Sequence, residues 1–79
     1  MASRDEIFSW VTGVLRDEFQ YTDKISLDSH LVDDIDLDSI DAIDMTVRLE
    51  EKTGLAFKED ELKSLRTVGD VVDLIDGRL

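Results

Sequence analysis

Helical spacing of apolar residues, with no competing strand pattern, is the feature that most restricts the fold of this chain. Residues 4–19, 39–52 and 68–76 place apolar side chains three and four positions apart, which lines one face of an α-helix. No segment alternates apolar and polar residues in the manner of a strand, and the chain has no proline. The pattern predicts an all-α four-helix bundle in one domain over residues 1–79. The third helix is short, near residues 59–62, and a long loop separates the first two helices.

Capping residues mark where the predicted helices begin and end. Ser3 and Glu6 have the three-residue spacing of a capping box, and Thr67 stands before the last apolar stripe. Asp38 precedes the second helix, where its carboxylate can accept the free N–H groups of the first turn. Gly54 suits the left-handed position that often follows a helix. We therefore expect the helices to start near residues 4, 39 and 68.

The loop between the first two helices shows no sustained period and is rich in turn residues. We expect four apolar side chains to hold it on the core: Ile25, Leu27, Leu31 and Ile35. The core itself is expected to form between the long helices, from Val11, Leu15, Ala42, Met45, Leu49, Val68, Val72 and Ile75. A loop of this length in so small a protein is uncommon and often functional.

The second predicted helix carries two apolar stripes on different sides. The first stripe consists of Ala42, Met45 and Leu49, and the second consists of Ile40, Ile43 and Val47. The flank between the stripes carries Asp41, Asp44, Arg48 and Glu51. A surface helix needs only one apolar stripe for its core. The second stripe is therefore either buried by another element or left free for a partner, and the pattern alone leaves both open.

The charge of the chain restricts the partners that it can bind. Twenty acidic residues against nine basic ones give a net charge of −11, which repels nucleic acid and favours basic protein surfaces. No apolar run approaches the roughly 20 residues of a membrane span. Residues 1–6 turn acidic where a signal peptide would become apolar. We expect a cytoplasmic monomer that binds no nucleic acid and spans no membrane.

Ser39 stands in the most acidic segment of the chain, and three chemical roles are open to it. Six aspartates and no basic residue lie between positions 33 and 44. A calcium loop starting at Asp34 fails, because it would need glycine where Ser39 stands and glutamate where Met45 stands. A serine nucleophile needs a neighbouring base, and His30 in the loop is the one histidine. We therefore expect no catalytic and no metal-binding residues, and the remaining role is covalent modification of an exposed hydroxyl.

The segment Asp34-Ile35-Asp36-Leu37-Asp38-Ser39-Ile40, followed by a helix, resembles the acyl carrier proteins. Their signature at this place is Asp-Leu-Gly-x-Asp-Ser-Leu. The resemblance extends over essentially the whole chain and includes Leu49-Glu50-Glu51-Lys52, the apolar residues around Phe57, and Thr67-Val68. Asp36 and Ile40 replace the usual glycine and leucine, and Arg48 adds a cation on a face that is usually neutral or acidic.

The resemblance implies a carrier that is not itself an enzyme. A phosphopantetheinyl transferase, or holo-carrier-protein synthase, would attach 4′-phosphopantetheine to Ser39, and the thiol of this arm would carry acyl groups as thioesters. Cysteine is absent from the chain, so the arm would supply the thiol. A cavity between the helices would shelter the acyl chain.

The resemblance also implies a recognition surface for ketosynthase, acyltransferase and other pathway enzymes with basic patches. Its expected residues are Asp38, Ile40, Asp41, Asp44, Val47 and Glu51. Fatty-acid, polyketide and aryl-polyene-type synthesis all fit. An aminoacyl or peptidyl carrier and an unmodified acidic helical interaction module stay as alternatives.

Overall fold

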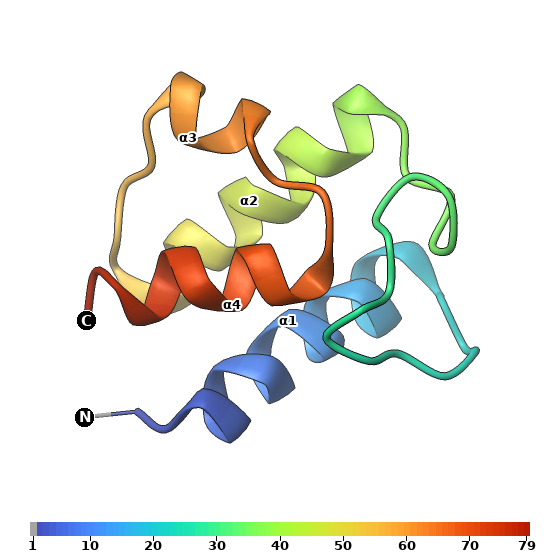
Figure 1. Cartoon of the computed structure of the whole chain (residues 1–79), viewed down its shortest axis with the longest axis horizontal. Helices are drawn as coiled ribbons and strands as arrows, with labels where there is room; N and C mark the ends of the chain where they lie inside the picture. Colours follow the sequence, from blue (N-terminus) through green and yellow to red (C-terminus); the bar gives the residue numbers. More distant parts are fainter. Residues whose placement is uncertain (1) are drawn as a thin grey trace.

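The computed structural model describes residues 2–79, and within them it contains four helices and no strand (Figure 1). The helices are α1 (Arg4–Phe19), α2 (Ser39–Thr53), α3 (Glu59–Lys63) and α4 (Val68–Asp76). This confirms the predicted all-α bundle with a short third helix and a long loop between α1 and α2. The helix α2 ends one residue later than predicted, where Gly54 takes the left-handed conformation with φ 76°.

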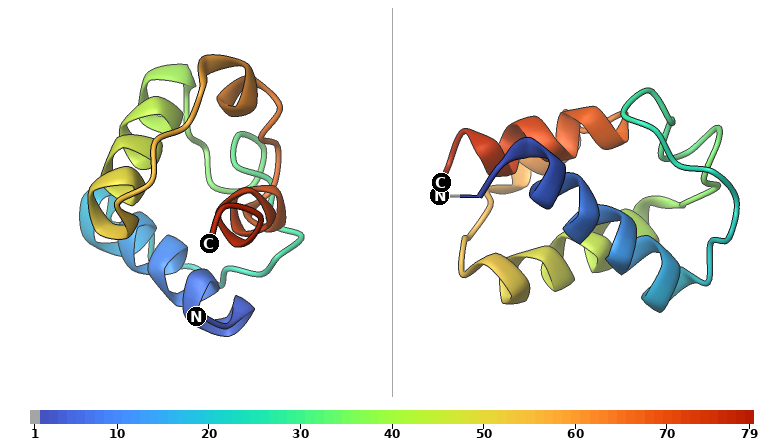
Figure 2. Two further views of the ribbon diagram at one scale, coloured as in Figure 1. Left: turned by 90° about the vertical axis from the view of Figure 1, so that its left-hand side faces the viewer. Right: turned by 90° about the horizontal axis from the view of Figure 1, so that it is seen from below.

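The helix α1 packs against both α2 and α4, and these three helices enclose the core. In Figures 1 and 2, α3 lies at the edge of the bundle opposite α1, beside α2 and α4. The most deeply buried side chains come from the three long helices: Ile7, Val11, Leu15, Met45, Leu49, Val68, Val71, Val72 and Ile75. Ala42, predicted as a core residue, is only half-buried and is not among the residues of this cluster.

The loop between α1 and α2 follows the prediction at three of its four expected anchor residues. Ile25, Leu31 and Ile35 are buried, but 43% of Leu27 is exposed, so the prediction that its side chain holds the loop is wrong. Its backbone does so instead, because the Leu27 carbonyl accepts a 2.8 Å hydrogen bond from the Gly69 N–H. A Cβ at Gly69 would lie 2.9 Å from that oxygen, so the contact requires glycine.

Further backbone hydrogen bonds fix the loop against the start of α4. The Leu31 N–H donates to the Arg66 carbonyl at 2.9 Å, and the Val68 N–H donates to the Ser29 carbonyl at 3.0 Å. These bonds also satisfy backbone groups that would otherwise be left without partners beside the core. The loop therefore reaches α2 from a fixed position at the start of α4.

Candidate functional site

Ser39 is the first residue of α2 and is exposed, as predicted. Asp38 is the N-cap: its Oδ1 accepts a 2.8 Å hydrogen bond from the Asp41 N–H. Asp41 Oδ2 in turn accepts from the Asp38 N–H at 3.4 Å, which completes a capping box. Aspartate fills the third position, where glutamate or glutamine is usual. The two carboxylates fix the start of α2 and leave the Ser39 hydroxyl outside the core.

Asp36 has a left-handed backbone, with φ 65°. This conformation is unfavourable for most residues, though aspartate and asparagine tolerate it better than others. It allows the chain to place Leu37 in the core, where only 4% of it is exposed, immediately before the cap of α2. The glycine that acyl carrier proteins usually have at this position would suit the same backbone without strain.

The acidic residues near Ser39 form hydrogen bonds with the backbone. Within residues 2–79 no cluster of three or more carboxylates or histidine is arranged to hold a metal ion. Asp34 Oδ2 accepts from the His30 N–H at 2.7 Å, and Asp38 and Asp41 cap the helix. These carboxylates therefore organise the backbone and surround Ser39 with negative charge.

His30 is not placed to activate a serine nucleophile. Its Nδ1 accepts hydrogen bonds from the Val32 and Asp33 N–H groups, at 3.3 and 3.2 Å. A neutral imidazole that accepts at Nδ1 carries its proton on Nε2, so neither nitrogen has a free lone pair. The histidine holds the loop in shape and offers Ser39 no base.

The second apolar stripe of α2 lies on the surface. Ile40 is 74% exposed, Ile43 is 55% exposed and Val47 is 41% exposed. The two possibilities left open by the sequence are thereby decided in favour of a free face. A run of large exposed apolar side chains along one helix is typical of a contact surface.

A hollow of about 410 Å³ lies between the start of α2 and α3. Its lining residues are Ser39, Ile43, Glu59, Leu62 and Lys63. This hollow opens beside Ser39. Sequence reasoning did not identify the three α3 residues of its wall; Leu62 among acidic neighbours was the one available signal.

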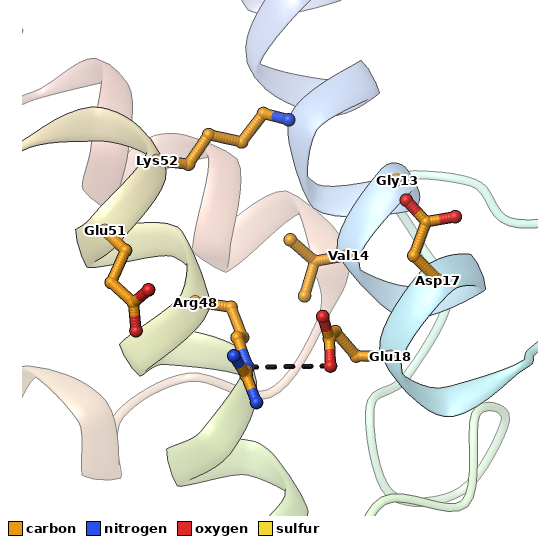
Figure 3. Close-up of a pocket in the computed structure, with 7 residues that line it drawn as sticks. All are labelled: Gly13, Val14, Asp17, Glu18, Arg48, Glu51 and Lys52. Atoms are coloured by element: carbon orange, nitrogen blue, oxygen red, sulfur yellow. Dashed lines mark ion pairs between the residues drawn. The ribbon is translucent and has the colours of Figure 1, made fainter.

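A second hollow, of about 350 Å³, lies between α1 and α2 and is lined mainly by charged residues (Figure 3). Arg48 spans its edge, with its Nε 3.6 Å from Glu18 Oε2 and 3.7 Å from Asp44 Oδ1. Glu51 lines the same hollow. Two carboxylates thus compensate the cation of Arg48, and α2 keeps an acidic flank.

The predicted recognition residues are accordingly spread along α2. Asp38, Ile40 and Asp41 lie at its start with Ser39, whereas Asp44 and Glu51 lie on the flank that faces α1. Val47 lies on the exposed apolar face. The set is thus divided between the start of α2, its flank towards α1 and its exposed apolar face. No helix within residues 2–79 combines the length and apolar character that crossing a bilayer requires.

Comparison with known proteins gives a consistent result over nearly the whole chain. The family model for the phosphopantetheine attachment site matches residues 9–75. Acyl carrier protein 2 of Ralstonia nicotianae is 37% identical over 75 residues, covering 94% of this chain and 93% of that protein. The acyl carrier protein of Coprothermobacter proteolyticus is 35% identical over 77 residues, covering 96% and 94%.

A solved structure from Mycobacterium tuberculosis, provisionally assigned as an acyl carrier protein, has the same fold. It superposes with a TM-score of 0.77 at 26% identity, covering 99% of this chain and all of that one. The family model, the sequence relatives and the matching fold all extend over nearly the whole chain. The chain therefore belongs to the acyl carrier protein family.

Proposed function

We propose that this chain is a cytoplasmic carrier that bears 4′-phosphopantetheine on Ser39 Oγ and delivers acyl groups to the enzymes of a biosynthetic pathway. Acyl carrier proteins are carriers and not enzymes, and their phosphopantetheine is covalently attached. The group supplies a flexible arm whose terminal thiol holds acyl groups as thioesters. This chain supplies the hydroxyl, the helix that presents it, and the surfaces around it.

The observation that carries the proposal is the exposed Ser39 at the first position of a capped helix, with a hollow beside it. A hydroxyl in this place is accessible to a transferase. The rigid start of α2 also fixes the direction in which an attached arm leaves the protein. A serine that served packing would lie in the core instead.

The electrostatics at Ser39 favour a loosely held arm. The N-terminus of a helix attracts an anionic phosphodiester by about 0.3–1 kcal/mol. Asp38 accepts from the Asp41 N–H and Asp41 accepts from the Asp38 N–H, and the negative charge of both carboxylates opposes the phosphodiester. The opposing effects leave the root of the arm free to swing between the protein surface and a partner enzyme.

The hollow between α2 and α3 suits an acyl chain. Ile43 and Leu62 line it, and Ser39 stands at its edge, so an arm attached there can fold back into it. Burial of each methylene would contribute about 0.8 kcal/mol. The cargo would thus be sheltered from water between deliveries.

Partner enzymes would read the exposed face of α2. Its recognition residues combine acids with apolar side chains: Asp38, Ile40, Asp41, Asp44, Val47 and Glu51. Basic patches on the transferase, ketosynthase and acyltransferase would be steered to the acids. Apolar contacts at Ile40 and Val47 would then hold the complex. Fatty-acid, polyketide and aryl-polyene-type synthesis are the pathways proposed.

Coexpression with a promiscuous phosphopantetheinyl transferase, followed by intact mass measurement, tests the proposal. The wild-type protein should gain the mass of one arm, and Ser39→Ala should gain none. Ser29→Ala is the matched control, because Ser29 also follows an aspartate, Asp28, but lies in the loop. An unmodified wild type, or a Ser39→Ala variant that still gains the arm, would contradict the attachment site.

A further inference from the structure

The helix α3 is held differently from the other three helices. It has five residues and no buried side chain, whereas each long helix buries at least three residues. Yet it supplies Glu59, Leu62 and Lys63 to the hollow beside Ser39. Phe57 and Leu65 on either side of α3 pack against the core, but α3 itself buries no side chain, so polar contacts also help to set the position of this wall.

One side chain from the end of the chain makes such contacts. Arg78 follows α4, and its Nη1 donates a 3.1 Å hydrogen bond to the Ala56 carbonyl in the segment before α3. Its Nη2 forms an ion pair with Oε2 of Glu61, within α3. A planar guanidinium can hold two such acceptors at once, which a lysine ammonium does less well. Arg78 therefore connects the end of α4 both to α3 and to the backbone segment that precedes α3.

Glu61 is fixed at both of its oxygens. Oε1 accepts from the Lys58 N–H at 3.0 Å, and Oε2 accepts from Arg78. The backbone hydrogen bond from Lys58 and then the contact with Arg78 lower the pKa of Glu61. The carboxylate is thus held in its charged form, and the pair is maintained at neutral pH.

We infer that Arg78 is a positioning residue that holds α3 as the wall of the hollow beside Ser39, and so controls how well an acyl chain is sheltered there. Glu61 and the three lining residues belong to one five-residue helix, so they move together when the contact with Arg78 is lost. The part of the inference that concerns cargo rests on the proposed attachment of the arm to Ser39; the part that concerns α3 does not.

Amide hydrogen exchange of the unmodified protein, followed by NMR at neutral pH, tests the position of α3. Arg78→Ala should speed exchange at Leu62, Ser64 and Leu65 by about three- to tenfold, because local opening is governed by the contacts of that segment. Exchange in the cores of α1, α2 and α4 should be unchanged. Arg4→Ala is the matched control, since Arg4 also forms exposed ion pairs, with Asp73 and Asp76, but does not contact α3.

The rate of thioester cleavage then tests whether the hollow shelters the acyl chain. Acetyl and octanoyl groups are loaded on the arm of wild type, Arg78→Ala and Arg4→Ala, and cleavage by hydroxylamine is timed. Arg78→Ala should speed cleavage of the octanoyl thioester by about threefold and leave the acetyl thioester nearly unchanged, because only the longer chain fills the hollow. If the substitution only destabilised the protein in general, the cleavage rates of the octanoyl and acetyl thioesters would rise equally.

The two measurements separate the two claims. If Arg78→Ala leaves exchange in α3 equal to that of Arg4→Ala, the positioning role is overturned. If exchange rises but octanoyl and acetyl cleavage change equally, the control of shelter is overturned. Failure to load Ser39 would instead overturn the proposed function, and the exchange result would still decide the role of Arg78.

Discussion

The helices α3 and α4 differ in how the chain holds them. The helix α4 buries Val68, Val71, Val72 and Ile75 against α1, and a capping box between Thr67 and Asp70 fixes its start. The helix α3 buries no side chain and is connected through exposed polar contacts. Burial therefore builds the scaffold, whereas the wall beside Ser39 depends on groups that water can replace. If the polar contacts of α3 are lost, we expect the wall to move without unfolding of the core.

Ser39 lies where the buried scaffold and the wall formed by α3 meet. It begins α2, whose Met45 and Leu49 are fully buried, so the hydroxyl has a rigid support. It also borders the hollow that α3 closes. The proposed attachment point is thus on a rigid support, whereas the proposed shelter lies against a weakly held helix, and the following predictions test this difference.

Truncating the core should unfold the scaffold far more than truncating the wall. Leu49→Ala removes a fully buried side chain, and we expect it to lower the free energy of unfolding by about 2–5 kcal/mol. Leu62→Ala, at a half-buried position in α3, should cost less than about 1 kcal/mol. Urea unfolding followed by circular dichroism measures both, and equal losses would contradict the division.

Two glycines test the close contact between the loop and α4. Gly69→Ala places a Cβ 2.9 Å from the Leu27 carbonyl oxygen, and we expect it to lower the free energy of unfolding by about 1–3 kcal/mol. Gly13→Ala meets nothing within 4 Å inside α1, so it should stabilise the protein by about 0.5–1 kcal/mol. Thermal unfolding of the pair provides the measurement; destabilisation by both changes would point to a general effect of substitution.

The left-handed backbone at Asp36 should tolerate glycine and reject a β-branched residue. Asp36→Val should lower the free energy of unfolding by about 1–2 kcal/mol, because its Cβ is strained at φ 65°. Asp36→Gly relieves that strain and should leave stability within about 0.5–1 kcal/mol of wild type. Chemical unfolding of the two variants tests the conformation, which a harmless Asp36→Val would contradict.

Charge reversal on α2 should impair loading without weakening the core. Asp44→Lys combined with Glu51→Lys should slow transfer of the arm by about tenfold at low salt, because electrostatic steering to a basic partner is lost. Both side chains are on the surface, so the melting temperature should change little. Added salt should shrink the difference from wild type. Loading at the wild-type rate would exclude these acids from recognition.

Acid should weaken the start of α4 through Asp70. Backbone hydrogen bonds from Thr67 and then Arg66 hold the pKa of Asp70 below its ordinary value of 3.8. Its stabilising contribution is therefore complete above about pH 4 and is lost as the pH falls through the lowered pKa. Asp70→Asn should reduce the acid sensitivity of the unfolding free energy. An unchanged pH dependence in this variant would contradict the role of Asp70.

Local signals explain which parts of the fold could be predicted from the sequence. Ser3, Asp38 and Thr67 act on the turn that follows them, so their positions predicted the starts of α1, α2 and α4. Leu27 was misjudged because its contact is made by the backbone, which apolar patterning does not report. The left-handed backbone at Asp36 was not predicted, because the position has no glycine to indicate it.

The candidate site was predictable only where one helix contains it. The position of Ser39 and the second apolar stripe at Ile40, Ile43 and Val47 follow from the pattern of α2 alone, whereas the exposure of that stripe is known only from the structure. The α3 wall of the hollow and the contact from Arg78 to Glu61 join distant parts of the chain. No spacing in the sequence indicates such tertiary contacts.

The central claim is that Ser39 is the point at which this protein holds its cargo. Mass spectrometry of the peptide that contains Ser39, from protein isolated from its native host, tests it most directly. We expect a phosphopantetheine arm on Ser39, with an additional acyl mass in part of the sample that identifies the pathway. A peptide found only unmodified, or an arm on any other residue, would contradict it.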